Sequence, residues 1–260
     1  MTPIRVALEI TPPKSSNVEV LLRRARLLGE RAAAVHVIQR ADRQPSVDAA
    51  AELERRGVHA VWHLVNRGRT ADDCARELER AAALQLRAAL IVRGEAGPLE
   101  TAPPPTLAEL VARARAALPA ARIGVALSPY APREKALANL WPKLDAGATF
   151  VQTQAVFEAR ALEPFAAAIR ARAPHVGIQP MLIPLLSVAA AERLGQRLRV
   201  PLPDTLLERL ERGGEPAGWD AFAELVAELR RSGLADSLAL MTHEMDPPKT
   251  FGERILAALS

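Results

Sequence analysis

Ile4-Arg-Val-Ala-Leu-Glu-Ile10 is a short apolar run rich in branched residues, and an amphipathic segment over residues 17–31 follows it. The apolar run predicts a buried strand. The second segment predicts a helix that covers this strand, because its apolar residues recur at helical spacing. These residues are Val18, Leu21, Leu22, Ala25 and Leu28. Together the two segments make one strand–helix unit.

The same alternation continues to the end of the chain, with a further helix predicted over residues 158–172. Eight runs are expected to be strands: 4–10, 33–38, 59–65, 87–93, 122–127, 149–153, 176–183 and 236–241. Alternating strands and helices are typical of α/β proteins with a parallel sheet. Eight such units in 260 residues predict a (β/α)8 TIM barrel, with an open doubly wound sheet as the alternative.

No linker divides the chain, so the barrel is expected to occupy residues 1–260 as a single domain. The proline-rich stretch 96–105 is predicted to be one long loop, and extra helices are expected around residues 203–232. Two helix starts have the form of a capping box, Ser16-Asn-Val-Glu19 and Thr106-Leu-Ala-Glu109.

Composition excludes several classes of protein. Hydrophobic residues make up 49% and charged residues 25% of the chain, as in ordinary folded proteins. Aromatic residues are only 3%, and 34 basic residues are interleaved with 30 acidic ones, so no nucleic-acid partner is expected. Cys74 is the single cysteine, which excludes an internal disulfide and predicts a small core residue. No apolar run is long enough for a membrane span, and a cytoplasmic location is expected.

In a barrel, chemistry takes place where strands end and the loops to the helices begin. Polar residues occupy these positions: Glu9, His36, His63, Arg93, Gly94, Glu95, Ser128, Tyr130, Gln152, Gln154, Thr242 and His243. Glu9 is the strongest candidate, because an unpaired carboxylate in a buried strand costs several kcal/mol or shifts its pKa.

Each candidate also has an ordinary structural explanation. Glu9 can form an ion pair in the barrel mouth with Arg93 or Lys143. The two strand-end histidines can be satisfied core residues. Arg93-Gly94 can simply end a strand with a glycine turn, and Gln154 can cap nearby amides.

Five segments follow one another in a characteristic order: Glu9-Ile-Thr-Pro-Pro-Lys14, His63-Leu64-Val65, Arg93-Gly94-Glu95, Lys143-Leu-Asp-Ala-Gly-Ala148 with Phe150-Val-Gln-Thr-Gln154, and Ile183-Pro184 with Val200-Pro201-Leu-Pro203. In this order and on these strands they resemble the methylenetetrahydrofolate reductase family, and the resemblance covers nearly the whole chain. It implies an oxidoreductase of one-carbon metabolism that serves methionine biosynthesis by reducing a folate-bound methylene group to a methyl group.

The resemblance also implies roles for individual residues. Glu9 would be the general acid that protonates N10 of 5,10-methylenetetrahydrofolate and opens its ring to an iminium. Gln154, Glu95 and Gln152 would bind the folate. The residues implied to line FAD are His36, His63, Arg93, Gly94, Ser128, Asn139 and Lys143. NAD(P)H would supply the hydride from the same barrel mouth, because the sequence has no Gly-x-Gly-x-x-Gly after a strand.

Several positions depart from the family's pattern, mainly around the cofactor. The family's Asp after Arg-Gly is Glu95, and its Tyr after the fifth strand aligns with Ser128. The Asp and Arg that flank the Asn of the fifth helix align with Ala136 and Pro142, and the second-strand Thr is His36. These losses predict FAD that is weakly held or absent after purification. Some relatives with this fold transfer hydride directly from NADH.

Two other functions stay open. The loss of several residues that contact the cofactor in the family is compatible with a folate-binding one-carbon protein of weakened activity. A metal-dependent lyase or hydrolase would follow if Glu9, His36, His63 and His243 converged on a divalent cation, although their spacing matches no metal motif. No metal ligand is therefore assigned, and the sequence does not decide between a monomer and a homo-oligomer.

Overall fold

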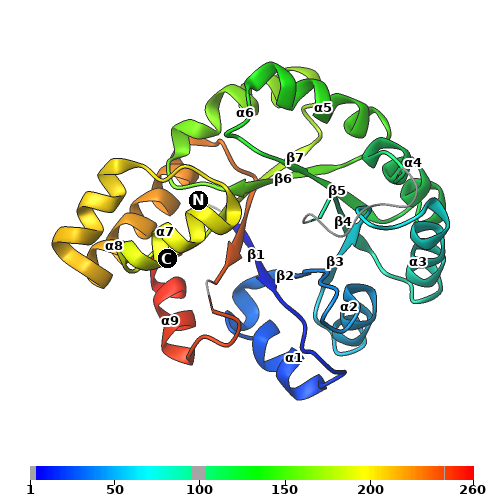
Figure 1. Cartoon of the computed structure of the whole chain (residues 1–260), viewed down its shortest axis with the longest axis horizontal. Helices are drawn as coiled ribbons and strands as arrows, with labels where there is room; N and C mark the ends of the chain where they lie inside the picture. The colour runs from blue at the N-terminus through cyan, green and yellow to red at the C-terminus, as the bar shows by residue number, and fades with distance from the viewer. Residues whose placement is uncertain (1–3, 95–103, 243) are drawn as a thin grey trace.

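The structure is a computed structural model that describes residues 4–94, 104–242 and 244–260. Its eight parallel strands close into a barrel in the order of the sequence (Figure 1). The strands are β1 (Arg5–Ile10), β2 (Ala32–Val37), β3 (Ala60–Val65), β4 (Ala88–Val92), β5 (Arg122–Leu127), β6 (Phe150–Ala155), β7 (Gly177–Leu182) and β8 (Ser237–Met241). The predicted (β/α)8 barrel is confirmed. The open-sheet alternative is wrong, because β1 pairs with β8 and closes the sheet.

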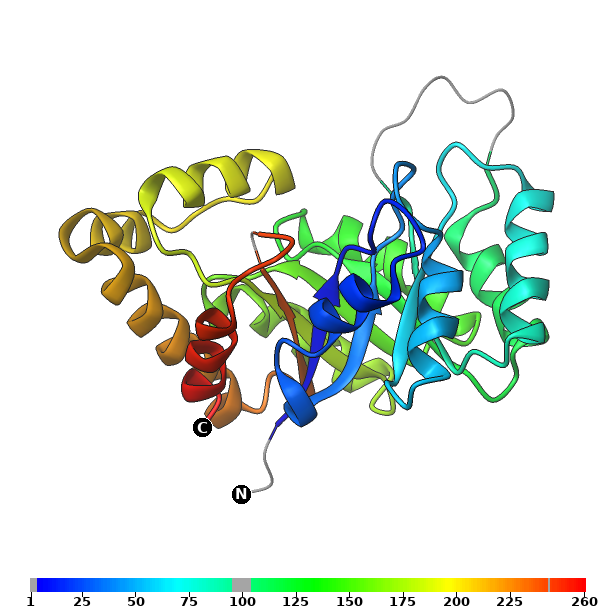
Figure 2. The ribbon, with the colours of Figure 1, turned by 90° about the horizontal axis from the view of Figure 1, so that it is seen from below.

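Helices surround the strands and bury their outer face (Figure 1). They are α1 (Val18–Ala25), η1 (Gly29–Arg31), α2 (Ser46–Glu54), α3 (Ala71–Ala83), α4 (Leu107–Ala117), α5 (Arg133–Asp145), η2 (Ala159–Ala161), α6 (Glu163–Arg172), α7 (Val188–Leu198), α8 (Asp204–Ser232) and α9 (Lys249–Ala258). The segment with α7 and α8, yellow to orange, lies on one side of the barrel (Figure 2). Helix α8 is kinked at Gly214, which has non-helical torsion angles. Most of the predicted loop 96–105 lies outside the described residues.

The two predicted helix caps have different outcomes. At α4 the capping box is confirmed, since Thr106 Oγ1 accepts from the Glu109 amide at 3.2 Å and the Glu109 carboxylate accepts from the Thr106 amide at 2.8 Å. At α1 the predicted box at Ser16 is wrong, because Asn17 is the cap and accepts from the Val20 amide at 3.1 Å. Ser and Asn are similarly good caps, so neighbouring candidates compete closely.

The predicted helix over residues 17–31 is too long. Helix α1 ends at Ala25, and the separate turn η1 begins at Gly29, which adopts φ +53°. Glycine takes this left-handed conformation without the strain of a side chain, and the chain therefore turns into β2.

Side chains of each strand alternate between the helical layer and the barrel interior. On β1, Val6, Leu8 and Ile10 belong to the large apolar core shared with the helices. Glu9 lies between two of these residues and therefore points inward. Deeper in the interior, Val61 and Phe150 belong to a smaller apolar cluster.

Gly218 allows α8 to pack against the loop after β7. A Cβ at this position would lie 2.1 Å from the carbonyl oxygen of Leu185. We expect Gly218→Ala to lower the free energy of unfolding by about 2–3 kcal/mol, because a helix must move to relieve the overlap. Urea denaturation measures this loss. Gly177→Ala is the control, since its Cβ would meet Phe150 at an ordinary 3.7 Å. Equal losses in both variants would contradict the packing argument.

Candidate active site

Four polar side chains from four strands meet inside the barrel, and we name them the central polar cluster. They are Glu9 on β1, His36 on β2, His63 on β3 and Gln152 on β6, with exposed fractions of 7%, 1%, 6% and 4%. Gln152 Nε2 donates to Glu9 Oε2 at 2.8 Å. His63 Nε2 lies 3.9 Å from the same oxygen. The polar residues predicted at these strand ends therefore meet around one carboxyl group.

An aromatic ring borders the cluster inside the barrel. The rings of His36 and His63 are edge to face, with centroids 5.7 Å apart, and the Phe150 ring lies 6.2 Å from His36. Gly124 provides the space for this ring, because a Cβ there would lie 2.1 Å from Phe150 Cζ. His36 thus has a partly apolar setting on this side.

Burial sets the charge state of the cluster. It raises the pKa of Glu9 from 4.5 to about 7, against the opposing effect of the hydrogen bond from Gln152. Burial lowers the pKa of His63 to about 3. The pKa of His36 is lowered as well, first by burial and then by the charges of His63 and Arg122. Near neutral pH, Glu9 can therefore hold and donate a proton beside two neutral imidazoles.

Within the described residues, three atoms of the cluster have no hydrogen-bond partner: His36 Nδ1, His63 Nε2 and Gln152 Oε1. Buried polar atoms in folded proteins are nearly always paired, so these are unusual. One ring nitrogen of each histidine thus lacks a partner in the described chain, which does not match the explanation of satisfied core residues. Within the described residues, Glu9 also forms no ion pair with Arg93 or Lys143.

Gln154, the predicted folate ligand at the end of β6, is half-buried. Its Oε1 accepts from the Ala155 amide at 2.9 Å, and its Nε2 lies 3.5 Å from the Leu198 carbonyl oxygen. These contacts match the amide-capping explanation. Folate binding by Gln154 stays a prediction that would require its side chain to exchange these partners.

The other predicted residues at strand ends are outside the cluster. Arg93 and Gly94 follow β4 and are exposed, as is Ser128 after β5. Gly94 has φ +83°, and a Cβ there would lie 2.3 Å from Val65 Cγ1, so backbone conformation and packing explain this glycine without any role in a site. Glu95 lies outside the described residues.

Two predicted flavin residues lie on α5. Asn139 is exposed, and Lys143 is half-buried one turn later, where burial lowers its pKa. No carboxylate of the described chain forms an ion pair with the Lys143 ammonium. Ala136 and Pro142 on the same helix provide no side-chain donor. These two predicted flavin residues thus offer one ammonium without an ion pair in the described chain and one exposed amide.

Sequence reasoning missed a second buried amide in the barrel, Gln179 on β7. It pairs in register with Gln152, and its Nε2 donates to Ser237 Oγ at 3.0 Å, while its Oε1 has no partner in the part of the chain that the structure describes. The signal was available, because Gln179 interrupts an apolar strand as Glu9 does. Arg122, whose guanidinium lies 5.2 Å from the Phe150 ring centre, was also missed.

A buried arginine holds the loop that follows Glu9. Arg24 on α1 is 8% exposed, and its Nη1 donates to the Thr11 carbonyl oxygen at 2.8 Å. Its Nε and Nη2 donate to the two carboxylate oxygens of Asp246 at 2.9 and 2.5 Å. These hydrogen bonds lower the pKa of Asp246 to about 2. The loop after β8 therefore fixes the loop after β1.

Asp246→Asn is expected to lower the free energy of unfolding at neutral pH by about 1–2 kcal/mol, because it leaves buried Arg24 without a counter-charge. Solvent limits the loss, since Asp246 is 40% exposed. The pKa of Asp246 is lower in the folded chain, so its contribution is present above about pH 4 and is lost as the pH falls toward 2. Urea denaturation at several pH values measures both effects.

The control for this prediction is Asp145→Asn, which breaks an exposed pair with Arg172. We expect less than about 0.5 kcal/mol from that change. A similar loss in both variants would show that Arg24 does not depend on Asp246.

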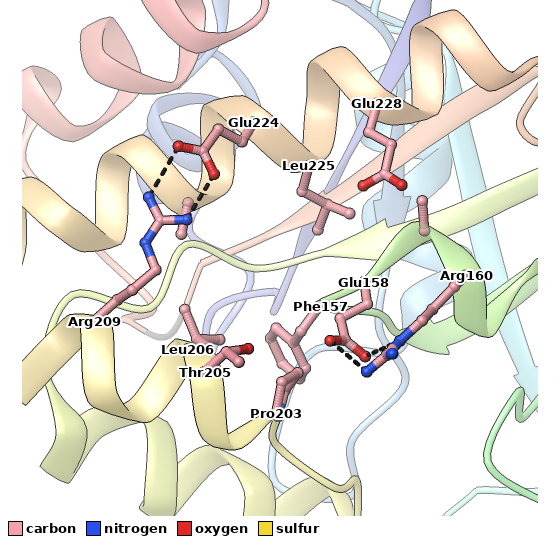
Figure 3. A pocket seen from close by; sticks show the side chains of 12 residues that line it. Phe157, Glu158, Arg160, Pro203, Thr205, Leu206, Arg209, Glu224, Leu225 and Glu228 are labelled. Atoms are coloured by element: carbon pink, nitrogen blue, oxygen red, sulfur yellow. Dashed lines mark hydrogen bonds and ion pairs between the residues drawn. The ribbon is translucent and has the colours of Figure 1, made fainter.

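A cavity of about 340 Å³ lies between the segment after β6 and helix α8 (Figure 3). Phe157 lines one side of it. Its arginines are already paired, Arg209 with Glu224 at 2.6 Å and Arg160 with Glu158 at 2.9 Å. No residue of the central polar cluster lines this cavity, so we place the candidate active site inside the barrel.

A closed (β/α)8 barrel with a protonatable carboxyl group beside two neutral imidazoles has the arrangement of a barrel enzyme. Sequence comparison identifies the family. The chain belongs to the methylenetetrahydrofolate reductase family, whose sequence model matches residues 2–250.

Individual relatives are distant. The chain is 30% identical over 216 residues to "Probable methylenetetrahydrofolate reductase (NADPH)" of Caenorhabditis elegans. The aligned region covers 75% of this chain but only 32% of that protein. It thus spans about a third of this relative. The solved structure of "QR15, an Aldolase" superposes with a TM-score of 0.54 at 12% identity, over 99% of both chains, and shows the fold alone. Among the described residues, no helix is long and apolar enough to cross a membrane.

Proposed function

We propose that this chain transfers a hydride from NAD(P)H, through FAD or directly, to 5,10-methylenetetrahydrofolate and forms 5-methyltetrahydrofolate. The observation that carries this proposal is Glu9, a buried carboxyl group with a pKa of about 7. It stands in the motif Glu9-Ile-Thr-Pro-Pro-Lys14 that resembles the family's first strand. Family membership supports the reaction class.

The proposed chemistry begins with proton transfer from Glu9 to N10 of the folate. The bond between N10 and the bridging carbon breaks, and its electron pair stays on N10. The carbon is left double-bonded to N5 as an iminium, which accepts the hydride and becomes the methyl group. Glu9 remains as a carboxylate, which the hydrogen bond from Gln152 stabilises until a proton from water restores the acid.

The residues present fit FAD only in part. Lys143 can pair with a diphosphate, because it has no carboxylate partner in the described chain, and Asn139 lies one turn away on the same face. Ala136 and Pro142 cannot donate hydrogen bonds through their side chains. FAD, when bound, would relay the hydride from the nicotinamide to the folate. We propose that it is held by few contacts and is lost on dialysis.

The test is an anaerobic assay of the purified chain with methylenetetrahydrofolate, NADH or NADPH, and with or without added FAD. We expect one 5-methyltetrahydrofolate for each nucleotide oxidised, and less than one flavin per chain after dialysis. Turnover without FAD would establish direct transfer. Stoichiometric FAD that survives dialysis would contradict the proposal that FAD is held by few contacts. Folate binding without any nucleotide oxidation would overturn the proposed reductase activity and favour the alternative of a folate-binding protein.

A further inference from the structure

The central polar cluster also has the composition of a transition-metal site. One ring nitrogen of His36, one of His63 and one carboxylate oxygen of Glu9 lie within 4.8 Å of one another. They come from the adjacent strands β1, β2 and β3, with Glu9 and His36 paired in register. Two imidazoles and one carboxylate form the protein ligands of many catalytic zinc and non-haem iron sites.

The unpartnered atoms of the cluster point to a missing ligand. His36 Nδ1 and His63 Nε2 are buried and bond to nothing in the described chain. A cation between the two rings would take up nitrogen lone pairs that otherwise stay unused. Gln152 Oε1 is also unpartnered, and it belongs to the amide that donates to Glu9. This oxygen can accept a hydrogen bond from a water molecule on the cation.

The distances are close to those of a metal site. Bonds of about 2.0–2.2 Å in a tetrahedron place ligand atoms about 3.4 Å apart. His63 Nε2 and Glu9 Oε2 are 3.9 Å apart, and one ligand atom from each of the three residues lies within 4.8 Å of the other two. Side-chain shifts of about 1 Å would complete the site.

We propose that Glu9, His36 and His63 bind one divalent first-row cation, Zn²⁺ in particular, with the fourth position open to water. Binding competes with the proposed reductase reaction, because the carboxyl group that holds the metal cannot also give a proton to the folate. Zn²⁺ is therefore expected to inhibit folate reduction. The site itself does not depend on that reaction. His243, the remaining histidine that the sequence suggested for a metal, lies outside the described residues.

The experiment is a titration of the chelator-treated protein with Co²⁺, without folate or nucleotide. Four-coordinate Co²⁺ absorbs visible light, and Zn²⁺ should displace it. We expect one Co²⁺ per chain, and affinity at least about 100-fold lower in His36→Ala, His63→Ala and Glu9→Gln. Matched controls are His59→Ala and His175→Ala, which remove exposed histidines at strand starts and should leave the titration unchanged.

Two results would overturn the site. One is a wild-type chain that binds no stoichiometric Co²⁺, whether or not it reduces folate. The other is undiminished binding in the His36→Ala/His63→Ala double variant. Glu9→Gln keeps the size of the side chain and so tests the site even if the histidine variants fold poorly. Because folate is absent from the titration, this result is separate from the outcome of the reductase assay.

Discussion

Glu9→Gln is expected to lower the rate of folate reduction by about 10²-fold or more, with folate affinity changed by no more than a few-fold. Glutamine keeps the shape of the side chain and an oxygen that can accept the hydrogen bond from Gln152. It has no acidic proton, so ring opening would depend on water. Steady-state kinetics at saturating nucleotide, together with equilibrium binding of the folate, measure the two quantities separately.

The control for Glu9→Gln is Glu19→Gln, the same chemical change at an exposed position on α1. It should leave both rate and affinity unchanged. Near-normal turnover in Glu9→Gln would remove Glu9 from the chemistry. A parallel loss of folate affinity would make Glu9 a binding residue instead of a proton donor.

The strands were predictable because their signal is local. The run 122–127 coincides with β5, and the other predicted strands agree with the structure to within two residues at either end. Each is an apolar run between amphipathic segments. A parallel strand that is buried on both faces needs apolar residues along nearly its whole length, so its position is visible in the sequence. The start of α1 was not predictable to the residue. Ser16 and Asn17 both offer a side-chain acceptor, and the choice between them depends on small energy differences.

The central polar cluster was predictable only as a set of separate positions. Glu9 and Gln152 are 143 residues apart, and their 2.8 Å contact depends on how the barrel closes. The same limit applies to Arg24 and Asp246, which are also far apart in the sequence. Arginine and acidic residues are common in this chain, so nothing in the sequence marks these two as a pair. Gln179 lacked a recognisable motif, although its place in an apolar strand carried the same physical signal as Glu9. A polar residue in a buried strand is therefore a better guide to this site than motif resemblance alone.

The pH dependence of folding stability has a definite sign at this site. The pKa of Glu9 rises from 4.5 to about 7 on folding, so its burial costs least below pH 4.5, and stability falls as the pH rises through 7. The pKa of His63 falls from 6.5 to about 3, so its burial costs stability as the pH drops below 6.5. The cost of burying Glu9 therefore grows from pH 4.5 to about pH 7 and is nearly complete at neutral pH, whereas the cost of burying His63 grows as the pH falls from 6.5 to about 3.

Folate reduction is expected to slow at alkaline pH, by about tenfold for each unit above pH 7. Glu9 must carry a proton to protonate N10, and with a pKa of about 7 the acid form is the minority above that pH. Burial lowers the pKa of both His36 and His63, so both rings are neutral at the alkaline pH values where the rate is expected to fall. The profile of kcat/KM from about pH 5 to about pH 9 measures the effect, because kcat/KM reports the pKa of the free enzyme. Glu9→Gln should flatten it, and a wild-type rate that stays constant up to pH 9 would show that the proton comes from another group.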